Sequence, residues 1–236
     1  MQQAIVIGAG GGIGRACVDH LVRSRRYGLV HALSRAPDPD SLAGVRSGSI
    51  DIADPASIAA AAEAFAGDVD LVIVATGLLH EGGRGPERSL GALDPDWLLR
   101  QYQVNAIGPA LALKHFVPKL ARDRRSVIAC LSARVGSISD NRLGGWYGYR
   151  ASKAALNQMV RTAAIDIART RARAVCVAIH PGTVETGLSA PFRGRVPPDR
   201  LFSPAVAAGH LLAVLDGLQP ADSGGIFAWD GSPIAP

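Results

Sequence analysis

The chain has 236 residues, of which 48% are hydrophobic and 19% are charged, with a formal net charge of +5; this composition predicts one globular domain over 1–236 and excludes a disordered or fibrous chain. Its arginine clusters lie near the ends of helix-like segments and not in a stripe interleaved with aromatic residues, so we expect no nucleic-acid surface. No charged leader precedes the first apolar run and no apolar run approaches ~20 residues, so we expect a cytoplasmic protein with no membrane partner.

The first predicted strand, AIVIG at 4–8, is apolar and leads into a run of glycines. Gly8, Gly12 and Gly14 have the spacing G-x-x-x-G-x-G and open a helix predicted over 13–26. Gly8 permits a tight turn, Gly12 lets backbone approach a pyrophosphate, and Gly14 lets the helix pack closely on the strand. A flexible turn is the alternative, but a strand, a glycine loop and a helix in this order favour dinucleotide binding.

The second predicted strand, at 29–33, ends in Ser34 and Arg35. An acidic residue at this place would suit the ribose 2′-hydroxyl of NAD, whereas an arginine suits the 2′-phosphate of NADP. The alternative is a surface arginine that leaves the strand. The connection at 35–44 contains two prolines, so we expect a truncated crossover helix there.

The rest of the chain alternates between apolar runs and segments with helical periodicity. Further strands are predicted at 45–51, 69–75, 126–132, 172–179 and 225–230, and helices at 55–66, 95–121, 147–170 and 204–218. The strands lack polar–apolar alternation, which is typical of a parallel sheet covered on both faces. This order predicts an α/β fold built from βαβ units.

Asn105 is a polar residue inside the helix predicted over 95–121. Asn is unfavourable within a helix because its side chain competes with the backbone for hydrogen bonds. Pro109, four residues later, leaves the carbonyl of Asn105 without its helical partner and predicts a kink. The side chain then either forms a water-relay site or lies on the surface beside the kink.

The stretch WYGYRASK places Tyr149 four residues before Lys153 at the start of a helix. Residues four apart share a helix face, whereas Tyr147 points elsewhere. We expect the lysine ammonium to lower the pKa of Tyr149 from about 10. The tyrosine would then serve as an acid and base near neutral pH.

These motifs occur together in an order that resembles the short-chain dehydrogenase/reductase family, over essentially the whole chain. The matching residues are Gly8, Gly12 and Gly14, Asn105, Tyr149 with Lys153, and PGTVET at 181–186. GSISDNRLGGWYGYRASKAALN resembles the branch of C-factor-like proteins and sniffer-type carbonyl reductases. The resemblance implies a doubly wound parallel sheet (a Rossmann fold) with strand order 3-2-1-4-5-6-7. It also implies NADP(H) as cofactor and a small-molecule carbonyl or alcohol as substrate.

The resemblance assigns roles to particular residues. Tyr149, Lys153, Ser132 and Asn105 would be catalytic, and Lys153 would also hold the nicotinamide ribose. The cofactor would contact Gly8, Gly12, Ile13, Gly14, Ser34, Arg35, Asp51, Ile52, Ala75, Gly77, Tyr149, Lys153, Pro181, Gly182, Val184 and Thr186. Asp51 would reach the adenine, although IDIADPAS also fits a turn or helix cap. Gly77 stands where the family has an Asn-Asn-Ala-Gly run, without the asparagines.

The family's Ser-Ser-x-x-Gly run is altered in this chain. Aligned on Gly136, the position of the substrate-binding serine holds Ala133, and Ser132 lies one residue earlier on the opposite strand face. Three alternatives are open. A bulge repositions Ser132, Ser137 or Ser139 replaces it, or the enzyme works with a weaker contact to the substrate oxygen. We take Ser132 as the best single candidate.

Two functions fit these observations. The first is an NADP(H)-dependent oxidoreductase that interconverts a carbonyl and a secondary alcohol, with a substrate loop at 187–204. The second is a nucleotide-binding regulatory or signalling protein with little turnover, which the alanine at position 133 would favour. The cysteines and histidines lack the spacing of metal ligands, so no metal is predicted. Family members often pair through their fourth and fifth helices, so a homo-oligomer is an open alternative to a monomer.

Overall fold

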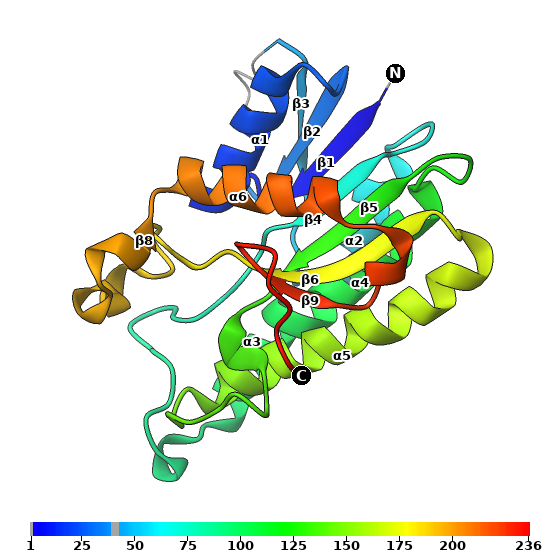
Figure 1. The fold of residues 1–236 in the computed structure, drawn as a ribbon. Coiled ribbons are helices and arrows are strands. Elements are labelled where there is room, and N and C mark those ends of the chain that lie inside the picture. Colours follow the sequence, from blue (N-terminus) through cyan, green and yellow to red (C-terminus); the bar gives the residue numbers. More distant parts are fainter. Residues whose placement is uncertain (1, 39–42) are drawn as a thin grey trace.

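The computed structural model describes residues 2–38 and 43–236, and its centre is a single seven-stranded sheet (Figure 1). All neighbouring strands pair in parallel, in the order β3-β2-β1-β4-β5-β6-β9. The strands are β1 (Gln3–Ile7), β2 (Leu29–Ser34), β3 (Val45–Ser49), β4 (Leu71–Val74), β5 (Ser126–Leu131), β6 (Ala174–His180) and β9 (Ile226–Ala228). Because β9 is the seventh strand of this sheet, the order implied by the resemblance is confirmed.

Helices cover both faces of the sheet, which confirms the predicted doubly wound α/β fold. They are α1 (Gly12–Ser24), α2 (Pro55–Glu63), α3 (Pro95–Tyr102), α4 (Gly108–Phe116), α5 (Tyr147–Thr170) and α6 (Pro204–Gly217). Side chains of α1 and α6 pack on one face, and those of α2, α4 and α5 pack on the other. Figure 1 shows α1 and α6 on one side of the sheet and α5 on the other. The bounds of α5 are those predicted from the sequence.

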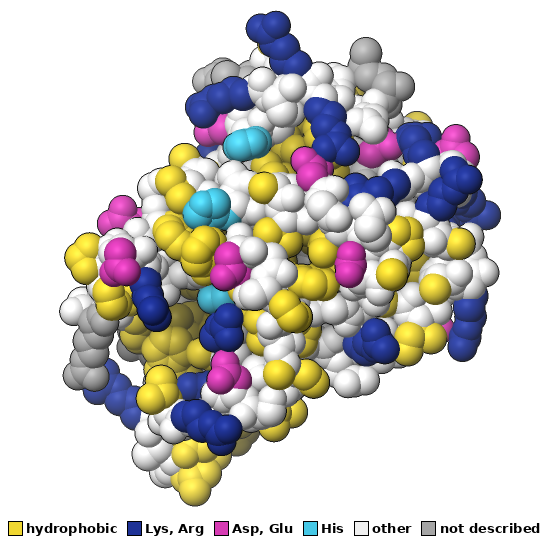
Figure 2. Space-filling view, viewed as in Figure 1, with side chains coloured by type: hydrophobic (Ala, Val, Ile, Leu, Met, Phe, Trp, Pro, Cys, Tyr) yellow, Lys and Arg dark blue, Asp and Glu magenta, His cyan; other side chains and the backbone are white. Residues whose placement is uncertain are grey.

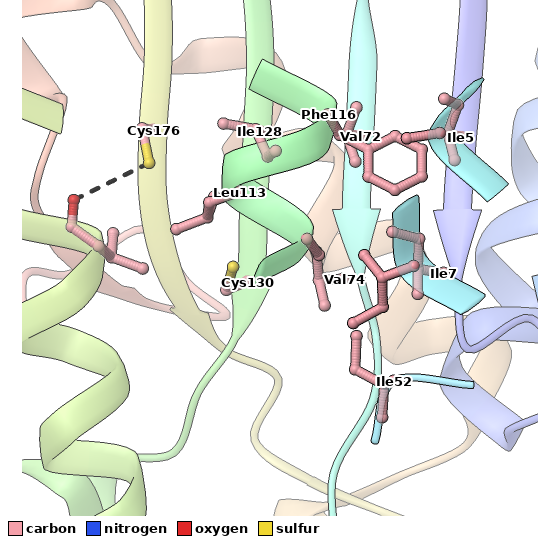
Figure 3. Packing of buried hydrophobic residues seen from close by; sticks show 14 of the residues in the cluster. Ile5, Ile7, Ile52, Val72, Val74, Leu113, Phe116, Ile128, Cys130 and Cys176 are labelled. Atoms are coloured by element: carbon pink, nitrogen blue, oxygen red, sulfur yellow. Dashed lines mark hydrogen bonds between the residues drawn. The ribbon is translucent and has the colours of Figure 1, made fainter. Parts of the chain in front are cut away.

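Strand side chains alternate between two apolar faces. In β1, Ile5 and Ile7 face α4 and α5, whereas Val6 faces α1 and α6. Figure 3 shows the first face, where strand residues surround Leu113 and Phe116 of α4. Burial of apolar surface at about 25 cal/mol per Å² drives this packing. The continuous apolar runs of the sequence are therefore strands that are buried on both sides.

The single helix predicted over 95–121 is divided in the structure. After α3 the backbone forms a π-helical turn, Gln103–Ile107, before α4 begins, and the N–H of Gly108 donates to the carbonyl of Gln103. Pro109 explains the interruption, because it has no N–H to donate to the carbonyl of Asn105. The predicted kink is thus present as a π-helical turn centred on Asn105.

Two connections bear on the predicted site. Residues 39–42 of the truncated connection lie outside the described residues, and 35–38 and 43–44 contain no helix. The segment 187–204 is folded into two short 3-10 helices, Ala190–Arg195 and Pro198–Arg200, and β8 (Leu201–Phe202) pairs with β7 (Thr183–Val184). The segment predicted as a substrate loop therefore contains short regular elements.

Acidic and basic side chains are interspersed on the face shown in Figure 2. The same face is hollowed, and hydrophobic side chains form the floor of the hollow. Within residues 2–38 and 43–236, no helix combines the length and apolar character needed to cross a membrane. The same residues contain no cluster of three His, Cys, Asp or Glu side chains suited to a metal ion.

Candidate active site

Tyr149 and Lys153 lie at the carboxyl edge of the sheet, in the first two turns of α5. The Lys153 ammonium is 5.9 Å from the centre of the Tyr149 ring, and both side chains are buried. Lys153 Nζ donates a hydrogen bond of 2.8 Å to the carbonyl of Leu131 at the end of β5. Tyr147 is only half-buried. The four-residue spacing therefore brings together the pair chosen from the sequence.

Burial controls the protonation of this pair. It raises the pKa of Tyr149 to about 12 and lowers the pKa of Lys153 from 10.5 to about 8. The expectation that Lys153 lowers the pKa of Tyr149 is therefore wrong, because burial raises that pKa. Both shifts have one cause, because desolvation disfavours the charged form of either group.

Replacing Lys153 by methionine is expected to change how stability depends on pH. Between pH 8 and 10.5 the Lys153 amine is more protonated in the unfolded protein than in the folded protein, so the contribution of this group to stability rises with pH and falls again as pH drops to 8. The contribution of Lys153 to the free energy of unfolding rises by about 2 kcal/mol between about pH 7.5 and 9.5. The K153M variant lacks this contribution, whereas the buried thiols and Tyr149 contribute similarly to both proteins.

Urea unfolding of wild type and K153M at about pH 7.5 and about pH 9.5 measures this contribution. It equals the change, between the two pH values, in the difference between their free energies of unfolding. Wild type should gain about 2 kcal/mol relative to K153M at the higher pH. An unchanged difference would show that the pKa of Lys153 is not lowered by burial.

Asn105 joins the π-helical turn to the segment that follows β4. Its Oδ1 accepts from the N–H of Leu78 at 2.7 Å, and its Nδ2 donates to the carbonyl of Leu78 at 2.8 Å and to Ser152 Oγ at 3.1 Å. The side chain is fully buried, so the alternative of a surface asparagine is wrong. A Cβ added to Gly77 would lie 3.8 Å from both Asn105 Oδ1 and Lys153 Nζ, so these three residues meet at one place.

Ser132 does not join this cluster. Its N–H continues the ladder to β6 by donating to the carbonyl of Ile179, and its hydroxyl donates to Asn157 Oδ1 at 2.7 Å. Ala133, in contrast, packs with Tyr149 in a small buried cluster. Strand alternation explains this arrangement, since neighbouring residues face opposite ways. The bulge that would have repositioned Ser132 toward Tyr149 is not formed.

The other two serines are also bonded elsewhere. The hydroxyls of Ser137 and Ser139 donate to the carbonyl oxygen of Pro236, at 3.4 and 2.6 Å. These hydrogen bonds do not involve Tyr149. Of the three alternatives drawn from the sequence, the geometry favours a weaker contact to the substrate oxygen.

The glycine loop lies against the end of β4 and the motif after β6. Gly8 has φ +89°, and a Cβ there would lie 3.0 Å from the backbone of Ala75. A Cβ at Gly14 would collide with the carbonyl of Gly8, and one at Gly12 would lie 2.8 Å from Thr186 Cγ2. The three glycines thus keep open a backbone cradle at the start of α1.

The remaining predicted cofactor residues are distributed along the same edge. They follow β3, β4 and β6 or open α1: Asp51, Ile52, Ala75, Gly77, Pro181, Gly182, Val184 and Ile13. Asp51 Oδ1 accepts a hydrogen bond of 2.9 Å from the N–H of Ala53, as the turn alternative predicts. Its contact with adenine stays a prediction. Thr76, between two of these positions, has a buried hydroxyl with no hydrogen-bond partner among the described residues.

A small pocket of about 120 Å³ opens beside the cradle, between β2 and α1. It is lined by Gly10, Ser34 and Arg15, whose guanidinium forms an ion pair of 3.1 Å with Asp38. Arg35 follows Ser34 directly and is exposed. Arg15 is absent from the list of cofactor residues predicted from the sequence, although it directly follows Gly14 of the glycine motif.

A larger cavity of about 1300 Å³ lies near the start of α5, and Tyr149 itself is not among its lining residues. Trp146 forms part of its wall, with its ring centre 6.2 Å from that of Tyr149 and 5.1 Å from that of Phe192. Nine of its lining residues come from one loop: His80, Gly83, Arg84, Gly85, Pro86, Glu87, Arg88, Ala92 and Asp94. Sequence reasoning missed this loop, although GGRGP has the glycine and proline content of the segment 187–204.

The open parallel sheet and its glycine cradle define a dinucleotide-binding α/β protein of the Rossmann type. The chain belongs to the short-chain dehydrogenase family, whose model matches residues 2–196. It is therefore an oxidoreductase by family. It is 33% identical over 168 residues to the C-signal protein of Myxococcus xanthus. This match covers 71% of this chain and 93% of that protein.

Two solved structures share the fold across the whole chain. The NADPH-bound carbonyl reductase from chicken fatty liver has a TM-score of 0.85 at 27% identity, covering 100% of this chain and 99% of that one. The carbonyl reductase Sniffer of D. melanogaster has a TM-score of 0.85 at 21% identity with the same coverage, which concerns the fold alone. The resemblance to the short-chain dehydrogenase/reductase family is thus confirmed, and the match to the C-signal protein agrees with the C-factor-like part of the resemblance.

Proposed function

We propose that the protein is an NADP(H)-dependent oxidoreductase that interconverts a carbonyl and a secondary alcohol. The observation that carries this proposal is the buried pair of Tyr149 and Lys153 on one face of α5, with Tyr149 beside Trp146, which lines the large cavity. A buried acid–base group next to the wall of a substrate-sized cavity, in a fold that has a nucleotide cradle, is an arrangement that suits such a reaction.

The residues present fit a dinucleotide phosphate. Gly8, Gly12 and Gly14 keep the cradle free of side chains, and the start of α1 offers N–H groups to a pyrophosphate. Arg35, with Arg15 in the small pocket, would supply positive charge to a ribose 2′-phosphate. The similar chicken reductase is described with NADPH bound, which supports the same choice here.

When bound, the nicotinamide would supply or accept the hydride. The Tyr149 hydroxyl would donate its proton to the carbonyl oxygen during reduction and take up the alcohol proton during oxidation. Because its pKa is about 12, Tyr149 is protonated at neutral pH, which is the form that donates a proton in reduction. Lys153 would hold the nicotinamide ribose, and Asn105 would keep the end of β4 in place through its bonds to Leu78.

The large cavity indicates the kind of substrate. Trp146 and Phe192 make an apolar wall next to Tyr149, and Arg84 and Arg88 lie on the loop opposite. Arg84 is paired with Asp94 at 3.0 Å. About 1300 Å³ is more space than a small aldehyde needs, so we propose a bulky, partly apolar carbonyl compound.

Replacing Arg35 by alanine is expected to weaken NADPH binding about 10- to 100-fold, because charge-assisted hydrogen bonds to the 2′-phosphate are lost. NADH, which lacks that phosphate, should bind as well as before. Fluorescence titration with both cofactors measures the two dissociation constants. The matched control is Arg23→Ala, which removes an exposed arginine from the far end of α1. Equal losses for NADPH and NADH would refute the role of Arg35.

The proposed function is tested by titrating NADPH and then following its oxidation with a panel of aldehydes, ketones and quinones. Binding with turnover of at least one carbonyl supports the proposal. Binding without turnover of any of them would instead favour the regulatory, nucleotide-binding alternative. Absence of NADPH binding would contradict both.

A further inference from the structure

Glu87 is a buried carboxylate on the loop that lines the large cavity. Its side chain is 4% exposed, although the loop around it is mostly at the surface. It forms no ion pair with any residue that the structure describes, and both of its oxygens instead accept hydrogen bonds from neutral donors. Oε1 accepts from Gln101 Nε2 at 2.7 Å, and Oε2 accepts from the N–H of Gly148 at 3.0 Å.

The second of these bonds caps the helix that carries Tyr149. The residue before α5, Trp146, has left-handed backbone angles (φ 54°, ψ 42°) and its side chain makes no capping hydrogen bond. The first turn of α5 contains no acidic residue. Glu87, from a distant part of the chain, caps the helix instead. Its carboxylate accepts from the N–H of Gly148, and its backbone carbonyl accepts from the N–H of Trp146. A carboxylate at a helix N-terminus also complements the helix dipole.

The absence of a side chain at position 148 allows this contact. A Cβ on Gly148 would lie 2.9 Å from Glu87 Oε1 and would collide with Gln101 Nε2. Gln101 is fully buried on α3, so this helix holds the carboxylate through the Gln101 amide. The backbone of Gly148, in the first turn of α5, is therefore held against the loop and α3. Tyr149 is the next residue of the same turn.

We propose that Glu87 is a positioning residue, which holds the first turn of α5 and thereby fixes the position of the Tyr149 hydroxyl. It acts by hydrogen bonding and does not touch the reacting atoms. This inference rests on the proposed function for its kinetic consequences, but its structural content is independent of turnover. Small displacements of an acid–base group cost much in rate, because proton transfer requires a defined geometry.

The test compares Glu87→Ala with Glu87→Gln. Alanine leaves the N–H of Gly148 and the amide of Gln101 without an acceptor. Glutamine offers its Oε1 to Gly148, and rotation of the Gln101 amide turns the Gln101 Oε1, which has no partner in the wild type, toward the new amide donor. The matched control is Glu81→Ala, which removes an exposed carboxylate of the same loop that pairs with Arg100.

We expect E87A to lower kcat about tenfold, with little change in the dissociation constant of NADPH. E87Q should recover most of the loss, and E81A should resemble the wild type. Amide hydrogen exchange should show faster exchange at the start of α5 in E87A but not near Thr170, with protection restored in E87Q.

Exchange distinguishes failure of this inference from failure of the proposed function. If the wild type shows no turnover but exchange changes as expected, the proposed function fails and the positioning role stands. If E87A leaves exchange at the start of α5 and kcat unchanged, the positioning role is overturned. Equal damage by E87Q and E87A would also overturn it, because the effect would then depend on charge and not on hydrogen bonding.

Discussion

Replacing Tyr149 by phenylalanine is expected to lower kcat for carbonyl reduction by about 10²- to 10⁴-fold, the range over which a general acid contributes. The substitution removes only the hydroxyl. The ring keeps its packing against Leu79 and Ala133, and Lys153 keeps its bond to the carbonyl of Leu131. The loss should therefore appear in kcat, while NADPH binding stays within about threefold. Single-turnover oxidation of NADPH together with fluorescence titration measures both quantities.

The matched control for this substitution is Tyr147→Phe. Tyr147 is a half-buried tyrosine two residues earlier on the same helix, and its side chain points away from Lys153. The control should retain nearly full turnover. If Y149F keeps wild-type turnover, or if Y147F loses as much, Tyr149 is not the proton donor and the mechanism assigned to this site is wrong.

The sequence was most informative where a regular spacing decides the geometry. Four residues on a helix place Lys153 beside Tyr149, and two residues do not, so this pairing followed from periodicity alone. Likewise, apolar runs without alternation predicted strands covered on both faces, and Pro109 predicted the break at Asn105. Each of these inferences depends on neighbours within one element.

The features that were missed depend on segments far apart in the chain. The pKa of Tyr149 rises because several segments bury it, and no local pattern reports how deeply a side chain is buried. Glu87 caps a helix that begins 60 positions later, which no capping motif within α5 could indicate. The cavity loop shows only a glycine- and proline-rich composition, which marks a connection without saying what it contacts.

One tertiary feature did follow from the sequence. Strand alternation indicated that Ser132 and Ala133 face opposite ways, and the structure has Ser132 bonded to Asn157 and Ala133 beside Tyr149. Naming Ser132 as the best candidate set this alternation aside in favour of a bulge. The pleat of the strand was the better guide to which of the two side chains lies beside Tyr149.

Replacing Ala133 by serine is expected to raise kcat/KM for carbonyl reduction, on the order of 10- to 100-fold. Removal of one donor to a developing oxyanion costs about 10²- to 10³-fold in enzymes that have it, so supplying a missing donor should recover part of that range. Position 133 has extended backbone angles (φ −147°, ψ 145°) that serine adopts without strain, and its side chain packs in the cluster of Tyr149. Steady-state kinetics with the best substrate of the carbonyl panel measures the gain.

The contrasting variant is Ser132→Ala, which removes the hydroxyl that is committed to Asn157. Its loss should weaken folding by about 1 kcal/mol, the net worth of one hydrogen bond, and should leave the chemical step nearly unchanged. The two variants together decide which face of the chain after β5 meets the substrate. A gain in A133S with little effect in S132A assigns that face to position 133. A large loss of kcat in S132A, with no gain in A133S, would return the role to Ser132 and would mean that its bond to Asn157 opens when substrate binds.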